Sequence, residues 1–270
     1  MFILIFSSSR MNNSVLTHAG NGDNMNADKP SAMYLERLRA LRLNLHYGDE
    51  ATQEQLDRIL DELKDDRDML RPKEKNEMFT IVDSNGKLTD MKAPRWLCHL
   101  LNLRHKVAHI LLKWQSPGLG EVFVLQVRSW DKADYPGHLD ISVGGHVNNA
   151  SNDDSLHAAY KEMEEELGVQ QQDLVDQKLH FVKGYVNYNK REDANFYNAE
   201  WRDVYIGEIS NQGLQKIHFK DNEVVGIYLC PEREVHNLLK QKFFPIANAL
   251  ECSLPFCLEE KQDNNQSIGK

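Results

Sequence analysis

A strand, a glycine pair, a polar loop and a capped helix follow one another up to residue 169, and no other feature of the chain constrains its fold as strongly. Gly144 and Gly145 end the strand, and the run Asp153-Asp154-Ser155 offers an N-cap. Four apolar residues share one face of the helix: Leu156, Ala159, Met163 and Leu167. Gly168 stands where a left-handed C-cap is needed. The sequence therefore predicts a strand–loop–helix unit whose helix packs on an apolar core.

The same helix carries three carboxylates on one side. Glu162, Glu165 and Glu166 are spaced i, i+3 and i+4, which makes them neighbours on the helix surface. Glu164 points elsewhere. Each like-charge pair costs roughly 0.2–0.5 kcal/mol, and a hard divalent cation would remove that repulsion. Acidic runs on helices are usually solvated faces, but the whole succession of strand, glycines, loop, cap and terminal glycine favours a cation site.

This stretch resembles a Nudix box, whose pattern is G-x5-E-x7-R-E-U-x-E-E-x-G-U, with U an apolar residue. The run Lys161-Glu162-Met163-Glu164-Glu165-Glu166-Leu167-Gly168-Val169 matches the second half at every fixed position except Lys161, where the family has arginine. In the first half, Asp153 replaces the first glutamate, and two extra residues separate Gly145 from Lys161. The extra length falls in the loop at 148–152, where an insertion costs little free energy.

The resemblance extends over residues 77–240. Residues 126–142 and the acidic turn at 221–224 are similar to the isopentenyl-diphosphate-isomerase-like branch of the Nudix superfamily. The resemblance implies an α/β fold, a Nudix-type α/β/α sandwich with a mixed sheet. Local patterns agree with an α/β fold and indicate strands at 79–82, 105–114, 121–127, 139–143, 181–186, 204–209 and 224–229, with helices at 154–167 and 232–240.

Four segments are expected along the chain. They are a disordered N-terminal segment at 1–30, a helical hairpin extension at 31–76, the Nudix hydrolase domain at 77–257 and a polar tail at 258–270. Met11 and Met25 are alternative translation starts. The hairpin is indicated by leucines at helical spacing and by the capping-box spacing of Thr52 and Gln55. It is expected to pack on the main domain or to form the contact of a homodimer.

By resemblance, the cofactor would be Mg²⁺ or Mn²⁺, and its ligands would be Glu162, Glu165, Glu166 and the carbonyl of Gly144. Such an ion neutralises a diphosphate, polarises phosphorus and lowers the pKa of a bound water. Either Glu162 or Glu165 would be the catalytic base, and the sequence leaves both open. Lys161 stands where the family's arginine orients these carboxylates, but a single ammonium does not reproduce a bidentate fork.

Other candidates lie outside this helix. Arg128 and Lys132, near the end of a strand, are candidates for phosphate contacts, and the alternative is that they are solvent-exposed loop charges. Glu200 and Asp203 are candidates for an additional metal ligand from a neighbouring strand. Three aromatic residues are candidates for stacking on a base, although core or rim packing is the commoner use of such side chains: Trp130, Tyr135 and Trp201.

Two alternatives to hydrolysis remain. One is isomerisation of an isoprenoid diphosphate, because His105 and His146 fall where the isomerases place metal-binding histidines. The isomerases also require a cysteine acid/base just before the Gly-His pair, and here that position is Gly144. The other is a non-catalytic diphosphate-binding module, which would have no reason to keep a self-repelling carboxylate cluster. Hydrolysis of a diphosphate bond in a nucleoside-diphosphate-linked or related small molecule is therefore the predicted function.

Composition and charge limit the classes of partner that the protein can bind and the cellular compartment in which we expect it. The net charge of −9 argues against a nucleic-acid polymer as partner, although a bound cation can invert the local charge at a site for an anionic substrate. No run approaches the ~18 consecutive apolar residues of a membrane span. The four cysteines fit neither a C-x-x-C pair nor a disulfide framework. We expect a cytoplasmic enzyme that acts on a small-molecule diphosphate without membrane association.

Overall fold

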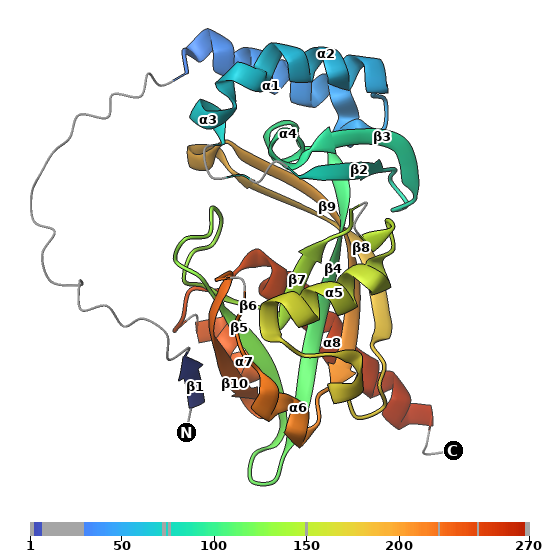
Figure 1. Cartoon of the computed structure of the whole chain (residues 1–270), viewed down its shortest axis with the longest axis vertical. Coiled ribbons are helices and arrows are strands. Elements are labelled where there is room, and N and C mark those ends of the chain that lie inside the picture. Colours follow the sequence, from blue (N-terminus) through green and yellow to red (C-terminus); the bar gives the residue numbers. More distant parts are fainter. Residues whose placement is uncertain are drawn as a thin grey trace, which may run out of the picture.

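The computed structural model describes residues 3–6, 30–71, 74, 77–148, 151–220, 222–241 and 243–267 (Figure 1). Its helices are α1 (Ala32–Leu45), α2 (Gln53–Leu63), α3 (Arg67–Leu70), α4 (Arg95–Leu101), α5 (Ser155–Leu167), α6 (Asn211–Lys216), α7 (Glu232–Gln241) and α8 (Asn248–Ser267). Its strands are β1 (Ile3–Phe6), β2 (Met78–Val82), β3 (Leu88–Pro94), β4 (Arg104–Ser116), β5 (Gly120–Arg128), β6 (Leu139–Asp140), β7 (Val143–His146), β8 (His180–Arg191), β9 (Phe196–Glu208) and β10 (Val224–Pro231). None of the helices in these ranges has the length and apolar character that a membrane crossing requires.

Strand β4 is the centre of the sheet. Along one edge, residues 112–116 of β4 pair antiparallel with β5, and residues 107–110 pair antiparallel with β7. Along the other edge, β9 runs parallel to β4 and itself pairs antiparallel with β8. β10 and β1 extend the sheet beyond β5. The parallel β4–β9 pair among antiparallel neighbours makes the sheet mixed, as expected.

Helices cover both faces of this sheet, because successive side chains of a strand point to opposite faces. On one face, Ile110 and Leu112 of β4 belong to the same buried cluster as Met163 of α5. On the other face, Leu111 of β4 lies in a cluster with Leu254 of α8 and with side chains of α7. Figure 1 shows α5 and α8 on opposite sides of β4. The layers are helix, sheet and helix, which confirms the predicted α/β/α sandwich.

Helices α1 and α2 form the predicted hairpin at one end of the molecule, next to β2, β3 and α4 (Figure 1). The predicted capping box begins α2: Thr52 Oγ1 accepts from the Gln55 amide at 3.3 Å, and Gln55 Oε1 accepts from the Thr52 amide at 2.9 Å. Leu38 and Leu56 share a buried cluster with Phe79 and with side chains of α4. The hairpin therefore packs on the main domain, which is one of its two expected roles.

Several elements lie where the sequence patterns indicated none. β1 pairs with β10 inside the stretch that was expected to be disordered, whereas residues 7–29 lie outside the described residues. α8 continues to Ser267, through most of the stretch that was expected to be a polar tail. α4 was not predicted, because its residues from Trp96 to Leu101 are all buried and show no amphipathic period.

Candidate active site

Helix α5 carries the predicted carboxylates, and it begins and ends at the two caps that the sequence indicated. Asp154 accepts a hydrogen bond from the His157 amide at 2.7 Å, and Gly168 ends the helix with a φ of +67°. Along its length, α5 approaches β7 so closely that a Cβ on Gly145 would lie 2.0 Å from Glu162 Cγ. A glycine at position 145 is therefore what allows Glu162 to lie against the end of β7.

A cavity of about 290 Å³ lies beside Glu162, and we call it the glutamate cavity. Its acidic side chains are Glu77, Glu162, Glu165 and Glu223, its basic side chains are Arg95, Arg128, Lys132 and Lys161, and Gly144, Gly145 and His146 complete the lining. Five residues that the sequence singled out for metal or phosphate lie together here: Gly144, Glu162, Glu165, Arg128 and Lys132. A diphosphate site needs both carboxylates and cations, and this cavity supplies both.

Three residues of the glutamate cavity carried no predicted role. Glu77 precedes β2, Arg95 begins α4, and Glu223 belongs to the turn before β10. Arg95 Nε lies 2.8 Å from the Oε2 of Glu74. Each is a single charge at the end of an element, without a spacing that relates it to the glutamate helix. Glu223 lies in the acidic turn at 221–224 that resembles the isomerase-like branch, whereas no motif marks Glu77 or Arg95, and the tertiary structure brings the three to the same space.

The two predicted phosphate-binding residues are held in position by partners. Arg128 donates to Asp140 Oδ2 at 2.9 Å and, through Nε and a terminal nitrogen, to the Asp134 carbonyl at 3.2 and 2.9 Å. Lys132 Nζ lies 2.5 Å from Glu223 Oε2. Both side chains are mostly buried, so they are part of the cavity wall rather than solvent-exposed loop charges.

Glu162 and Glu165 differ in their electrostatic environment. Burial, opposed by Lys161 and reinforced by the carboxylates of Glu165, Glu223 and Glu77, raises the pKa of Glu162 to about 7. Lys161 Nζ lies 2.6 Å from Glu165 Oε2 and 3.7 Å from Glu162 Oε1, so one ammonium contacts both carboxylates. A divalent cation among these oxygens would remove their repulsion, and the donor set therefore fits Mg²⁺ or Mn²⁺.

The third predicted ligand, Glu166, does not line the glutamate cavity. Its side chain is buried, and its Oε2 accepts from Gln126 Nε2 of β5 at 3.4 Å. The i, i+4 spacing puts Glu166 on the same side of α5 as Glu162, but one turn further along the helix. Its assignment as a metal ligand remains a prediction.

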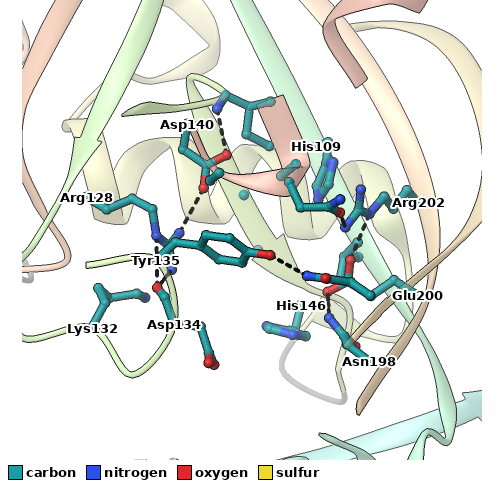
Figure 2. Close-up of a pocket in the computed structure, with 18 of the residues that line it drawn as sticks. His109, Arg128, Lys132, Asp134, Tyr135, Asp140, His146, Asn198, Glu200 and Arg202 are labelled. Atoms are coloured by element: carbon teal, nitrogen blue, oxygen red, sulfur yellow. Dashed lines mark hydrogen bonds and ion pairs between the residues drawn. The ribbon is translucent and has the colours of Figure 1, made fainter. Parts of the chain in front are cut away.

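A second cavity of about 120 Å³ adjoins the first, and we call it the polar cavity (Figure 2). Six residues line both cavities: Arg95, Arg128, Lys132, Gly144, Gly145 and His146. Figure 2 shows Asn198, Glu200 and Arg202 of β9 on one side, and Arg128, Lys132, Asp134 and Asp140 on the other. The side chain of Tyr135 extends between these two sides, and its hydroxyl accepts from Asn189 Nδ2 at 2.6 Å.

Glu200 and Asp203, the candidates for an additional metal ligand, are separated in the structure. Glu200 lines the polar cavity, where its carboxylate accepts from Arg202 Nε at 2.8 Å and from Asn198 Nδ2 at 2.6 Å. Although burial alone would raise it, the Arg202 guanidinium holds the pKa of the Glu200 carboxyl well below its usual range. Asp203 lines neither cavity and accepts from Trp201 Nε1 at 2.9 Å.

Three imidazoles form a histidine cluster next to the polar cavity: His99, His105 and His146. One ring nitrogen of each lies within 4.8 Å of the others, and their Nε2 atoms are buried without hydrogen-bond partners. Nδ1 of His105 donates to the Leu103 carbonyl at 3.0 Å, and Nδ1 of His99 donates to Glu74 at 2.7 Å. Burial lowers the pKa of His105 to about 4, and its Nδ1 faces a carbonyl, so the Nε2 of His105 carries a lone pair, as ligation of a transition metal requires.

The histidine cluster is the tighter of the two candidate metal sites. In the ranges that the structure describes, three ligand atoms converge within 4.8 Å in this cluster and in the group Glu74, His99 and Asp134, but not among the glutamates of α5. His105 and His146 were candidates from the sequence, whereas His99 was not. No local signal marks His99, because it lies in the buried helix α4 among apolar neighbours.

Of the three aromatic candidates for stacking, Tyr135 lines the polar cavity, and Trp130 and Trp201 line neither the polar nor the glutamate cavity. Its backbone has a φ of +53°, which is uncommon for a bulky residue. Trp130 is 70% exposed, and Trp201 packs close to Gly86 and Gly184. Packing is therefore the observed use of Trp201.

Comparisons with known proteins bear on this geometry. A model of the NUDIX domain matches residues 104–250. This range includes β4, α5 and the strands whose side chains line the two cavities. Nudix hydrolase 3 of Arabidopsis thaliana is 31% identical over 168 residues, which are 62% of this chain and 21% of that protein. The chain therefore spans about one fifth of the length of this relative.

Solved structures show similarity at lower sequence identity. The Deinococcus radiodurans protein DR0079 is 20% identical, with 65% of this chain and 95% of that chain covered and a TM-score of 0.46. The NUDIX domain of Shewanella oneidensis NrtR, complexed with ADP ribose, is 13% identical, with 57% and 86% covered and a TM-score of 0.44.

Proposed function

The chain belongs to the NUDIX domain family, and from this premise we propose that it hydrolyses a diphosphate bond in a small molecule, with Mg²⁺ or Mn²⁺ as cofactor. The proposed substrate is a nucleoside diphosphate linked to a second group, or a related small-molecule diphosphate. The observation that carries the proposal is the glutamate cavity, which Glu162 and Glu165 line together with Arg128 and Lys132. Carboxylates bind a hard cation and basic side chains bind phosphate oxygens, so a metal–diphosphate complex has partners for both components.

In this proposal Glu162, Glu165, Glu166 and the carbonyl of Gly144 would hold the ion. When bound, the ion would act as a Lewis acid toward the diphosphate and neutralise part of its charge. Glu162 or Glu165 accepts the proton of the attacking water. Lys161, which contacts both of these carboxylates, orients them.

Arg128 and Lys132 are proposed to bind the phosphate oxygens. Their existing partners, Asp140 for Arg128 and Glu223 for Lys132, fix the two side chains in the cavity wall before a ligand arrives. Such preorganisation reduces the entropy that binding would otherwise cost. Arg95, which lines both cavities, is positioned for a third phosphate contact.

The proposal is tested by removing single charges from α5. Glu162→Gln and Glu165→Gln keep the shape of each side chain, and we expect each to reduce Mg²⁺-dependent turnover by about 10²-fold or more, a typical contribution of a positioned acid or base. Glu164→Gln is the matched control, because Glu164 lies on the same helix but accepts from Gln170 outside the glutamate cavity. We expect its turnover to stay within about twofold of wild type.

The assay measures phosphate release and products from ADP-ribose, dinucleotides, nucleoside triphosphates and isopentenyl diphosphate, with and without Mg²⁺. Cleavage of a diphosphate bond only in the presence of the metal is the expected result. Unchanged turnover of Glu165→Gln would contradict the assignment of the catalytic helix. No reaction across the whole panel would instead favour a non-catalytic diphosphate-binding module.

Isomerisation of an isoprenoid diphosphate is the second candidate, and the histidine cluster is the observation that favours it. Hydrolysis remains the first proposal, because Gly144 offers no side chain to move a proton where the isomerases use a cysteine. Product analysis with isopentenyl diphosphate separates the two. An isomerised product without phosphate release would rank isomerisation first.

The location, partners and oligomeric state of the protein are also proposals, and they rest on the sequence. We propose a cytoplasmic location, no nucleic-acid partner, and a homodimer formed through the hairpin, where Met33 and Leu43 are exposed. Light scattering of the full chain measures the mass in solution, and a monomer would contradict the homodimer.

A further inference from the structure

The polar cavity adjoins the glutamate cavity, since six residues, among them Arg128, Lys132 and Gly145, line both. When a diphosphate lies beside Glu162 and Glu165, as in the proposed function, the polar cavity is the neighbouring space for the organic group attached to it. The chemistry of that cavity determines which organic groups it accepts.

The polar cavity is small, and its charges nearly balance. Its volume of about 120 Å³ is well below the roughly 300–1,000 Å³ of pockets that hold drug-sized ligands. Four cationic side chains line it, at Arg95, Arg128, Lys132 and Arg202, against three carboxylates, at Asp134, Asp140 and Glu200. With no excess of negative charge, the cavity does not favour a cationic group, and its volume favours one compact group over a whole nucleoside.

The wall of this cavity presents hydrogen-bond acceptors without partners. Asn198 is 5% exposed, and its Oδ1 is buried without a hydrogen bond, because only its Nδ2 is engaged by Glu200. Asp134 Oδ1 is also buried without a hydrogen bond, and its nearest ion-pair partner, Arg191, lies 3.6 Å away. The other buried atoms of this wall without a hydrogen bond are the Nε2 atoms of His99 and His146, which belong to the histidine cluster, and Arg95 Nε, which lies 2.8 Å from a carboxylate oxygen. Buried acceptors of this kind require donors from a ligand or from water.

We propose that the polar cavity holds the organic group of the substrate as a compact hydroxyl-bearing group, such as a pentose, rather than an isoprenyl chain or a whole nucleoside. The inference rests on the proposed function for the position of the diphosphate. Hydroxyl groups of the ligand donate to Asn198 Oδ1 and Asp134 Oδ1. Apolar side chains that also line the cavity, including Val107 and Ile141, contact the carbon atoms of the ring.

An isoprenyl chain would occupy the same space without supplying a donor. Both acceptors would then stay unpaired after the chain had displaced their water, which penalises binding. Sites built to bond a hydroxyl reject analogues that lack it much more strongly than apolar pockets reject an added methylene. The polar cavity is therefore expected to discriminate by hydroxyl content.

Calorimetric titration of the full chain with three monophosphates tests this inference. The probes are ribose 5-phosphate, isopentenyl phosphate and adenosine monophosphate, which share one phosphate and differ in the organic group. We expect ribose 5-phosphate to bind at least about tenfold more tightly than isopentenyl phosphate, and adenosine monophosphate to bind no more tightly than ribose 5-phosphate. Equal or tighter binding of isopentenyl phosphate, or tighter binding of adenosine monophosphate, overturns the inference.

Two matched variants locate the effect. Asn198→Leu should weaken ribose 5-phosphate binding about tenfold and leave isopentenyl phosphate binding within about twofold. Asn187→Leu is the control, because the Oδ1 of Asn187 is also buried and unpaired but the residue lines neither cavity. An equal loss in both variants overturns the inference. If Asn198→Leu does not fold, the order of the wild-type affinities for the three monophosphates still supports or overturns the inference.

This experiment also separates the inference from the proposed function. Binding of the monophosphates is measured without turnover. A protein that hydrolyses no diphosphate contradicts the proposed function, and the affinity order of the three probes then still supports or overturns the inference about the polar cavity.

Discussion

The imidazole of His109 lies in the wall of the polar cavity, where burial determines its charge. The residue is on β4, is 5% exposed, and has its Nδ1 2.8 Å from Ser253 Oγ. Burial lowers the pKa of His109 to about 3, with a further lowering from Arg202 and an opposing effect of Glu200. The ring is therefore neutral near pH 7 and contributes hydrogen bonding, rather than charge, to the cavity.

This neutral histidine makes stability depend on pH. In the unfolded chain the pKa of His109 returns to about 6.5, so between pH 6.5 and 3 the unfolded state binds a proton that the folded state does not. Above pH 6.5 the effect of His109 on the free energy of unfolding does not change with pH. Below pH 6.5 the free energy of unfolding decreases as the pH falls, by about 2 kcal/mol at pH 5. Denaturant unfolding of wild type and His109→Asn at pH 7.5 and pH 5 measures this loss. The decrease in the free energy of unfolding should be smaller in the variant by that amount, and an equal decrease would contradict it.

The contact between β7 and α5 positions the candidate catalytic helix. β7 is hydrogen bonded to β4, and α5 places Met163 in the core on one face of the sheet. The Glu162 side chain occupies the space that a Cβ of residue 145 would take, so the backbone of Gly145 limits how far this side chain can move. The strand and the helix therefore act as one unit in presenting the carboxylates.

Gly145→Ala should disturb this unit at one point. The new Cβ would lie 2.0 Å from Glu162 Cγ, so the Glu162 side chain has to move. Because misplacing a catalytic group by about 1 Å can cost on the order of 10²-fold, we expect a comparable loss of Mg²⁺-dependent turnover in a folded protein. Gly118→Ala is the control, since nothing lies within 4 Å of its Cβ position. Full activity of Gly145→Ala, measured with folding by circular dichroism, would show that Glu162 is not constrained in this way.

At the scale of the whole molecule, the N-terminal helices and the main domain share buried surface. Leu56 of α2 lies in the same cluster as Phe79 of β2 and Trp96 of α4. The segment after α3 also reaches the cavities: Arg71 contacts Asp134 at 3.0 Å, and Glu74 accepts from His99. The helical extension is therefore structurally continuous with the polar cavity and the histidine cluster.

This continuity predicts cooperative unfolding. Leu56→Ala removes a buried side chain from the shared cluster and should lower the free energy of unfolding by about 2–5 kcal/mol. Leu43→Ala is the control, because Leu43 on α1 is 66% exposed, and its effect should stay within about 0.5 kcal/mol. Denaturation followed by near-ultraviolet circular dichroism should show one transition in each protein. A separate early transition in Leu56→Ala would mean that the helical extension unfolds independently.

The strand–loop–helix unit was predictable because its signals are local. The caps at Asp154 and Gly168 and the glutamates of α5 all lie within one short segment, where helix geometry alone relates the residues. Of the predicted apolar face, Ala159, Met163 and Leu167 are buried, whereas Leu156 in the first turn is 38% exposed. The same reasoning predicted the capping box of α2 and most strands. It failed for α4 and β1, because α4 is buried over six consecutive residues without an amphipathic period, and β1 forms a strand by pairing with β10, which is distant in the sequence.

The family, the layered α/β architecture and the helix that presents Glu162 and Glu165 can be inferred from the sequence alone, since each follows from spacing within a few turns or strands. The folded chain was needed to show that Glu77, Arg95 and Glu223 line one cavity with those glutamates, that Glu166 accepts a hydrogen bond from Gln126 outside that cavity, and that His99 meets His105 and His146. These residues come from elements distant in the sequence, and pairing of strands across the sheet brings them together. The position of a residue within its own helix or strand does not predict its contacts with distant elements. The polar cavity and its unpaired acceptors could therefore be found only in the folded chain.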